Sequence, residues 1–324
     1  MGIRWFAPIS AMATKYDEGV PAVITESVAK LLADAGLDPV HVERVAAMAL
    51  DEDLDGGLDV TSFATVGEES RSVADFTARA RGVAAGIPVA ATVLAMATEG
   101  AAEFDFRVGD GERVEPGTVL FTASGPTRGL LTGERSALNL LCRLSGIATL
   151  TRAFVDAVEG TGTRIRDTRK TTPGLRRLEK YAVRCGGGAN HRMSLSDAAL
   201  VKDNHVVAAG GVVEAFAAVR RQFPGVPVEV EVDSLDQLLP VVDAGADLVL
   251  LDNFTPERMR AAVLLVGRNE PYGRTRLEAS GRLTLDQARA AAQTGVDYLA
   301  VGALTHSAPI LDVGCDFRAE TTAV

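Results

Sequence analysis

Cysteine is scarce in this sequence of 324 residues, with Cys142, Cys185 and Cys315 far apart and no Cys-x-x-Cys pair. Three scattered cysteines exclude a disulfide framework and a cysteine zinc site, and they are typical of a protein from a reducing compartment. Long apolar runs are missing as well. The longest, residues 82–97, contains Pro88 and is too short to cross a membrane. We therefore expect a cytoplasmic protein with no membrane partner.

Positive charge is in the minority, since 33 Lys and Arg residues stand against 43 Asp and Glu residues, a net charge of −10. Such an acidic chain is a poor candidate for binding nucleic acid or an anionic membrane surface. Any small anion that it binds must meet a local basic cluster. One exists at residues 164–192, where nine Lys or Arg residues and two acidic residues give a net charge of +7.

The cations of this cluster have two kinds of surroundings. Arg169 and Lys170 follow a predicted strand, and Arg192 follows the glycine-rich segment 186–189. We expect these three to face a pocket for a substrate with several negative charges, because guanidinium groups bind carboxylate and phosphate bidentately. Other cations have helical spacing and are expected on a solvated helix face. They are Arg177, Lys180 and Arg184.

The pattern of the chain changes near residue 138. Before it, helical and strand patterns are mixed, as in an α+β domain. After it, short β-branched runs alternate with helical patterns, which is the order of parallel βαβ units. The predicted strands are 163–166, 199–201, 228–232, 248–251, 276–279 and 298–301. The predicted helices between them include 212–222, 235–244, 256–266 and 285–294.

Polar residues or glycine end each predicted strand, and this decides between the two parallel architectures. In a barrel all carboxyl ends meet at one mouth, where active sites lie. In an open sheet only the strands beside the switch point would place polar residues at the active site. The pattern therefore favours an α/β barrel, with either hidden strands or an incomplete barrel. We predict a loose extension over residues 1–25, an α+β domain over 26–137 and a barrel domain over 138–305.

Strict alternation with valine places Glu229, Glu231 and Asp233 on one face of a strand. If that face lines the barrel, a carboxylate near the strand's end needs Lys202, Lys170 or a metal ion as partner, because an unpaired buried charge is costly. The alternative is an edge strand with one wet face.

Asp252 ends the next strand, which is apolar on both faces and is therefore predicted to be buried. Glu231 and Asp252 would then lie at neighbouring strand ends and offer carboxylate oxygens. Such a site suits Mg²⁺, held directly or through water, or the hydroxyls of a sugar.

Two glycine-containing loops follow the last two predicted strands. They are Ser-Gly-Arg at 280–282 and Val-Gly-Ala at 301–303. Late loops of barrels often bind a phosphate through backbone N–H groups, and glycine permits that close approach. Either motif alone is ordinary turn chemistry, but the pair predicts a phosphate site.

Two other functions remain open on the residues alone. Lys170 or Lys202 could form the Schiff base of a lyase, but such a lysine needs a desolvated pocket, whereas these stand among anion-binding groups. The segment 110–120 is similar to a lipoyl or biotinyl hairpin, as in a carrier protein, but no lysine stands at its turn. We interpret this segment as scaffold.

Five motifs occur in order along the chain. They are DTRKTTPGLR at 167–176, GGGANHR at 186–192, KDNH at 202–205, EVEVD at 229–233 and LDN at 251–253. These motifs resemble the quinolinate phosphoribosyltransferase family, the carboxylating nicotinate-nucleotide pyrophosphorylases of NAD biosynthesis. The segments LTGERSALN at 131–139 and GLDVTS at 57–62 are similar to the same family. The resemblance extends from about residue 30 to residue 317.

The resemblance implies a pentosyltransferase reaction in which quinolinate and phosphoribosyl pyrophosphate give nicotinate mononucleotide, CO₂ and pyrophosphate, with Mg²⁺ as cofactor. It implies an incomplete (β/α) barrel of the type II phosphoribosyltransferase kind beside an α+β open-sandwich N-terminal domain. A C-terminal tail over residues 306–324 would return to that domain. It also implies a homodimer, or a dimer-based oligomer, whose partner chain completes the site.

The resemblance also implies roles for individual residues. The side chains implied to hold the two carboxylates of quinolinate are Arg169, His191, Arg192 and, from the partner chain, Arg135. The implied catalytic residues are Lys170 and Lys202 for the charge of the phosphoribosyl substrate, and Glu231 and Asp252 for ribose hydroxyls and Mg²⁺. The 5′-phosphate would lie on Ser280, Gly281, Arg282, Val301, Gly302 and Ala303. Thr168 and Arg176 complete the implied substrate-binding set.

Small departures from the family pattern exist. Arg282 stands where the family usually has Gly or Asn, and Gly133 stands where Ala is common. A paralogous phosphoribosyltransferase of the molybdenum-gene-linked type, acting on another nitrogen heterocycle, is the alternative. The presence of Arg135, Arg169 and Arg192 favours a dicarboxylate substrate and so favours quinolinate.

Overall fold

The computed structural model describes residues 24–267 and 275–319. The predicted loose extension over residues 1–25 therefore lies almost wholly outside the described residues, as do residues 320–324 of the predicted tail. Within the described part, no helix combines the length and the apolar character needed to cross a membrane.

An antiparallel sheet organises the N-terminal half. Its strands lie in the order β12-β1-β5-β3, and β2 pairs separately with β4. The strands are β1 (Arg71–Ala78), β2 (Gly82–Val83), β3 (Glu103–Phe106), β4 (Arg113–Val114), β5 (Val119–Pro126) and β12 (Val313–Ala319). The helices before and among them are α1 (Glu26–Asp34), α2 (Pro39–Leu54), α3 (Val60–Thr65) and α4 (Ile87–Ala97). This is the α+β arrangement expected from the mixed patterns.

Aromatic side chains hold the centre of this sheet together. Phe76 of β1 pairs in register with Phe121 of β5, and their rings stack with centroids 4.4 Å apart. Both residues are fully buried. Cross-strand aromatic pairs of this kind stabilise an antiparallel ladder beyond the burial of apolar area.

The segment 110–120 connects the two halves of the chain through Asp110. The carboxylate of Asp110 accepts hydrogen bonds from the N–H groups of Gly86 (2.7 Å) and Ile87 (3.1 Å) at the start of α4, and from the hydroxyl of Tyr181 (2.8 Å). Burial raises the pKa of Asp110 above its usual value. These contacts agree with the interpretation of the segment as scaffold.

Six parallel strands form the second half, in the order β6-β11-β10-β9-β8-β7. They are β6 (Arg164–Arg166), β7 (Ala199–Val201), β8 (Val228–Val232), β9 (Leu248–Asp252), β10 (Arg276–Ser280) and β11 (Tyr298–Ala300). The helices are α6 (Arg176–Cys185), α7 (Asp203–Ala209), α8 (Val212–Gln222), α9 (Leu235–Asp243), α10 (Pro256–Val266), α11 (Leu285–Ala292) and α12 (Ala303–His306). Among the described residues β6 and β7 do not pair with each other, so the barrel is incomplete and the predicted fold class is confirmed.

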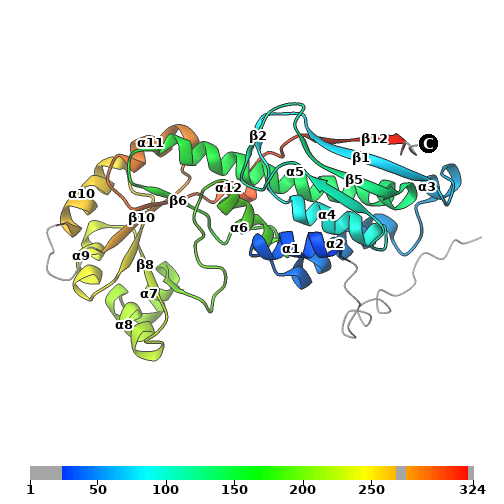
Figure 1. The fold of residues 1–324 in the computed structure, drawn as a ribbon. Coiled ribbons are helices and arrows are strands. Elements are labelled where there is room, and N and C mark those ends of the chain that lie inside the picture. The colour runs from blue at the N-terminus through cyan, green and yellow to red at the C-terminus, as the bar shows by residue number, and fades with distance from the viewer. Residues whose placement is uncertain (1–23, 268–274, 320–324) are drawn as a thin grey trace, which may run out of the picture.

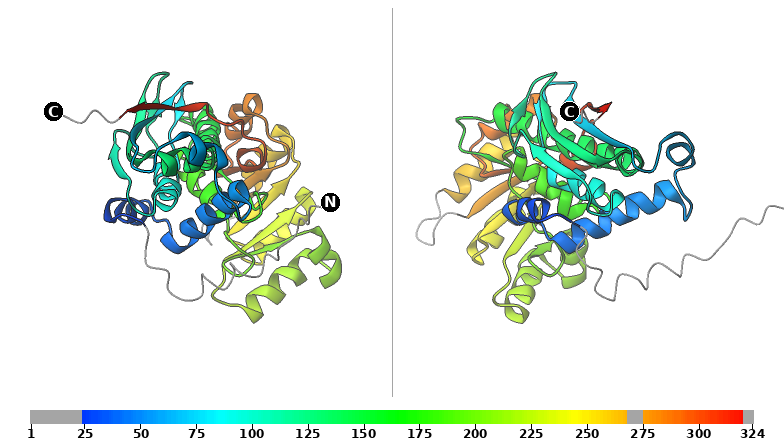
Figure 2. Two further views of the ribbon diagram at one scale, coloured as in Figure 1. Left: turned by 90° about the vertical axis from the view of Figure 1, so that its right-hand side faces the viewer. Right: turned by 45° about the vertical axis from the view of Figure 1, so that its right-hand side comes forward.

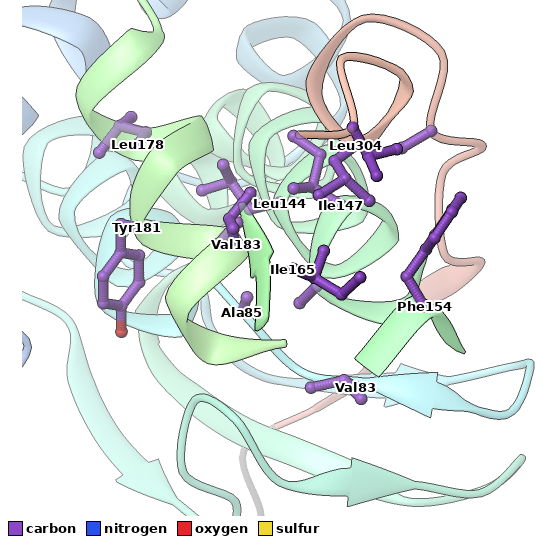
Figure 3. Packing of buried hydrophobic residues seen from close by; sticks show 14 of the residues in the cluster. Val83, Ala85, Leu144, Ile147, Phe154, Ile165, Leu178, Tyr181, Val183 and Leu304 are labelled. Carbon is purple, nitrogen blue, oxygen red and sulfur yellow. The ribbon is translucent and has the colours of Figure 1, made fainter. Parts of the chain in front are cut away.

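One long helix, α5 (Thr127–Ala157), joins the two halves. Figure 1 shows it running from the antiparallel sheet to the parallel strands. Leu144 and Ile147 of α5 are buried against the barrel half, near Val183 of α6 and Ile165 of β6 (Figure 3). The predicted boundary between residues 137 and 138 falls inside this helix, so the division into domains remains a prediction.

The C-terminal strand returns to the N-terminal sheet. β12 pairs antiparallel with β1 and lies at the edge of that sheet (Figure 2). The chain reaches it along α5, where the N–H of Leu311 donates to the carbonyl of Cys142 (3.0 Å). Gly146 allows this approach, because a Cβ there would overlap the Pro309 carbonyl oxygen and lie 2.8 Å from the Cα of Ile310.

We predict that Gly146→Ala destabilises the protein by about 1–3 kcal/mol, the usual cost of overpacking. An alanine inside a helix ordinarily stabilises by about 1 kcal/mol relative to glycine, so the sign of the change is diagnostic. The measurement is the free energy of unfolding in urea. Gly225→Ala is the control, because no described heavy atom lies within 4 Å of its added carbon. Equal or higher stability of the Gly146→Ala variant would contradict this packing.

Candidate active site

A cavity of about 810 Å³ opens at the carboxyl ends of the six parallel strands. It is lined by most of the residues that the sequence singled out. Those residues are Thr168, Arg169, Lys170, His191, Arg192, Lys202, Glu231, Asp252, Ser280, Gly281, Arg282, Gly302 and Ala303. The barrel topology brings most of them together, because they belong to the end of a strand or to the loop that follows one. His191 and Arg192 instead follow α6, and Ala189 just before them forms a parallel bridge with Arg166 of β6.

Three of the predicted site residues do not line this cavity. Arg135 is exposed on α5, in the N-terminal half. Arg176 donates to the hydroxyl of Thr171 (3.0 Å) and to the carbonyl of Met193 (3.3 Å), and so joins two loops beside the cavity. Val301 is buried, and its N–H donates to the carbonyl of Arg166 (2.9 Å).

Two arginine side chains bring positive charge to the cavity. The Nε of Arg169 is buried and has no hydrogen-bond partner among the described residues. Burial, and then the neighbouring guanidinium of Arg169, lower the pKa of Arg192. A guanidinium donor without a partner, beside a second cation, is an arrangement that an anionic ligand would stabilise.

A buried acidic group, Glu229 and Glu278, lies beside His191. Glu278 forms an ion pair with Arg166, and Glu229 lies 2.7 Å from the Nε2 of His191. Burial raises the pKa of Glu229 to about 7, and burial together with Glu229 raises the pKa of Glu278 to about 7. Burial also lowers the pKa of His191 to about 4, so the imidazole is neutral near pH 7. The Nδ1 of His191 accepts from the N–H of Arg192 (2.7 Å), which assigns the proton to Nε2.

The alternative of a wet edge strand for Glu229 and Glu231 is wrong. β8 lies inside the sheet between β7 and β9, and Glu229 is buried. Glu231 lines the cavity, and one of its oxygens lies 2.5 Å from the Nζ of Lys202. Lys202 is one of the three partners that the sequence predicted for this carboxylate, the others being Lys170 and a metal ion.

The expected solvated face of α6 is wrong for one residue. Arg177 and Arg184 are exposed as expected, but Lys180 is fully buried and forms an ion pair with the fully buried Asp167. Desolvation lowers the pKa of Lys180, and the carboxylate of Asp167 opposes that shift. Helical spacing placed Lys180 on the wrong side because its partner comes from another element, directly after β6.

The two glycine loops border the cavity as predicted, but their glycines have a further structural reason. Gly281 has a φ of 120°, and a Cβ there would lie 3.0 Å from the Cα of Asn253. Gly302 precedes α12, and a Cβ there would lie 3.2 Å from the Cδ of Lys170. Each glycine therefore permits close contact between neighbouring loops at the cavity.

Glu231 and Asp252 fit a hard divalent cation by the chemistry of their donors. They stand at the carboxyl ends of the neighbouring strands β8 and β9, and both line the cavity. Asp252 accepts from the amide of Asn253 (2.7 Å), which orients its carboxylate. Mg²⁺ prefers oxygen ligands and usually takes only one or two carboxylates from the protein.

Several residues of the site were given no definite role from the sequence, and among them His306 was left open between a ligand contact and a structural histidine. Glu229 and Glu278 form the buried acidic group, with Arg166 as a partner, and Asn253 and His306 line the cavity. Alternation in the strand 228–232 placed Glu229 on the face that would line the barrel, and the position of Glu278 in the strand 276–279 could have been interpreted in the same way. Nothing in the sequence indicated which cation would pair with each.

The comparisons with known proteins agree with one another. The family models for the N-terminal and C-terminal domains of quinolinate phosphoribosyl transferase match residues 59–145 and 147–316. The nicotinate-nucleotide pyrophosphorylase (carboxylating) of Mycobacterium leprae is 52% identical over 270 residues, covering 83% of this chain and 94% of that protein. The probable enzyme of the same name from Synechocystis sp. is 43% identical over 249 residues, covering 76% and 83%.

The solved structures give the same result. The crystal structure of NadC from Streptococcus pyogenes superimposes with a TM-score of 0.82 at 38% identity, covering 88% of this chain and 99% of that chain. The two family models together span most of the sequence, and their junction falls inside α5. This chain therefore belongs to the quinolinate phosphoribosyl transferase family.

Proposed function

We propose that this protein transfers the phosphoribosyl group of phosphoribosyl pyrophosphate to quinolinate and decarboxylates the product. Nicotinate mononucleotide, CO₂ and pyrophosphate result, as in de novo NAD biosynthesis. The observation that carries the proposal is the pair Arg169 and Arg192, two neighbouring cations at a cavity of a chain from this family. Two guanidinium groups suit a planar dicarboxylate.

The carboxylate end of the site holds quinolinate. Arg169 offers an Nε donor with no described partner, and Arg192 lines the same cavity. His191 lies beside them as a neutral imidazole, held by Glu229. Thr168 and Arg176 hold the loops that present these groups, since Thr168 accepts from the N–H of Lys170 and Arg176 donates to Met193.

The phosphoribosyl end lies on the other strand ends. Lys170 and Lys202 offset the charge of the pyrophosphate, and Glu231 and Asp252 bind the ribose hydroxyls. The 5′-phosphate binds at the two glycine loops, where Ser280, Gly281, Arg282, Gly302 and Ala303 line the cavity and Val301 supports them from the core.

The charges fit the reaction that these substrates undergo. Breaking the C1′–pyrophosphate bond develops positive charge at C1′ and negative charge on the leaving group. Carboxylates near the ribose and lysines near the pyrophosphate stabilise both changes. Mg²⁺, when bound at Glu231 and Asp252, would neutralise phosphate charge. The ring nitrogen attacks C1′ and becomes positive, so it accepts the electrons that departing CO₂ leaves on the ring, and a proton replaces the carboxylate.

The proposal includes a homodimer in which Arg135 serves the partner's cavity. Arg135 is exposed on α5 and does not line the cavity of its own chain. The same half carries exposed apolar side chains on α2 and α3, among them Val60 and Phe63, at 71% and 60% exposure. Such residues are typical of a surface that another chain covers. The three cysteines are free thiols, which suits the cytoplasm as the site of action.

Two alternatives are less well supported. A Schiff-base lyase needs a desolvated lysine, but Lys170 is exposed and Lys202 lies beside the carboxylate of Glu231. A paralogue for another heterocycle has no need of two neighbouring arginines for carboxylates.

The proposal predicts that the protein consumes quinolinate only when phosphoribosyl pyrophosphate and Mg²⁺ are both present. Nicotinate mononucleotide, CO₂ and pyrophosphate should appear in equal amounts, and a chelator should stop the reaction. Chromatography of the nucleotide and release of labelled CO₂ measure this. Turnover of nicotinate but not of quinolinate would refute the substrate assignment. Trapping of a carbonyl substrate by borohydride would favour the lyase.

We predict that Arg169→Met raises the KM for quinolinate roughly 10- to 100-fold, the usual value of a charge-assisted hydrogen bond. The KM for phosphoribosyl pyrophosphate should change little. Since the Nε of Arg169 has no described partner, the variant should fold normally. Arg177→Met is the matched control, because Arg177 is exposed outside the cavity. An unchanged quinolinate KM would show that Arg169 does not contact this substrate.

Sharing of the site predicts complementation between two inactive chains. Arg135→Ala and Lys170→Ala should each abolish activity, because each substitution removes one required side chain from both sites of the homodimer. In mixed dimers one of the two sites regains both residues, so random mixing should restore about a quarter of the wild-type activity. Subunit exchange followed by assay tests this. Verified mixed dimers without activity would contradict the donation of Arg135 across the interface.

A further inference from the structure

Lys180 is a buried cation whose side chain bonds to Asp167, directly after β6, and to the loop that carries His191. Its side chain is fully buried, and its Nζ donates to the carboxylate of Asp167 and to the backbone carbonyl of His191 (2.9 Å). Lys180 is absent from the lining of the cavity. It therefore acts on the site through the residues that it holds.

Asp167 holds the same loop from the other side. Its carboxylate is fully buried and accepts from the backbone N–H of His191 (2.8 Å) and from the side-chain amide of Asn190 (2.6 Å). The amide of Asn190 also donates to the backbone carbonyl of Lys180 (2.8 Å). Both backbone polar groups of His191 are thus fixed by the two members of one ion pair.

This loop carries two side chains that line the cavity, those of His191 and Arg192. The backbone N–H of Arg192 donates to the imidazole of His191, whose other nitrogen lies 2.7 Å from Glu229. The ring is held at both nitrogens, and its backbone is held at both polar groups. Lys180 thus supports the backbone of His191 and, through the imidazole, the backbone of Arg192, whose guanidinium also donates to the carbonyl of Ala198 (3.0 Å).

We propose that Lys180, paired with Asp167, is a positioning residue that sets His191 and Arg192 in the orientation that receives the carboxylates of quinolinate. The inference rests on the proposed function for the identity of the ligand. A buried ion pair is seldom more stabilising than apolar residues of the same volume, so the pair is better explained by the orientation that it enforces than by stability. Its directional hydrogen bonds to a backbone N–H and a backbone carbonyl supply that orientation, which apolar groups could not.

The test separates positioning from folding with two variants and a control. Lys180→Met removes the donor to the His191 carbonyl but leaves Asp167 as an unpaired buried charge. The double variant Lys180→Met, Asp167→Asn removes that charge as well and keeps an oxygen that can accept from the His191 N–H. Arg177→Met, on the exposed face of the same helix, is the control. Calorimetry gives the Kd for quinolinate, thermal melting gives stability, and steady-state kinetics give KM for both substrates.

We expect Lys180→Met to lower the melting temperature and to raise the quinolinate Kd roughly 10- to 100-fold, since small misplacements of binding groups have effects of this size. The double variant should regain much of the melting temperature but keep the weak quinolinate binding. In both variants the KM for phosphoribosyl pyrophosphate should change less than the KM for quinolinate. If Lys180→Met does not fold, the quinolinate Kd of the double variant alone tests the inference.

The inference is overturned if the double variant is stable and binds quinolinate as tightly as the wild type, or if the KM of both substrates rises equally. The proposed function fails separately. A wild-type protein that binds quinolinate without forming nicotinate mononucleotide would refute the activity, while the comparison of Kd values would still test the positioning. A wild-type protein that does not bind quinolinate would overturn both.

Discussion

The balance of charge inside the barrel is the constraint on which the site depends. Asp167 and Glu278 are fully buried, and Lys180 and Arg166 are their partners. A buried carboxylate without a partner would be severely destabilising. Lys180 and Arg166 therefore stabilise the fold and are not available to bind a ligand. Arg169 retains a donor that no described residue accepts, and it is therefore available to an anionic ligand. The acidic chain thus offers a cationic donor at the cavity.

Helix α6 controls the geometry of that place through consecutive residues. Glu179 accepts from the N–H of Thr172 (3.0 Å) in the loop after β6, while Lys180 donates to the carbonyl of His191. The next residue, Tyr181, donates to Asp110 of the N-terminal half. One turn of helix therefore fixes two loops of the cavity and attaches them to the rest of the molecule. The side chains of α6 that hold these loops are themselves buried.

Local patterns predicted the six parallel strands and most of the helices between them, because β-branched runs and helical spacing alternate clearly after residue 138. They left open whether the barrel has hidden strands or is incomplete, and only the resemblance to the family implied the incomplete barrel. The ion pair of Lys202 and Glu231 was among the predicted possibilities, since both residues stand near neighbouring strand ends. The burial of Lys180 was not predicted, because helical spacing shows which residues share a face but not which element covers that face. Glu278 was missed as a site residue for the same reason, since its partner stands on another strand. A residue that a second chain contributes to the site cannot be predicted from the hydrophobic pattern of a single chain.

The continuity of α5 has a consequence for how the chain can be divided. Leu141, Leu144 and Ile147 lie beyond the predicted boundary, yet they belong to a helix that begins in the sheet half at Thr127. A fragment ending near residue 137 would leave the remainder with an uncovered apolar stripe, which promotes self-association. A cut at the predicted boundary would therefore divide one continuous helix, and residues 138–157 would lose the N-terminal turns of the helix to which they belong.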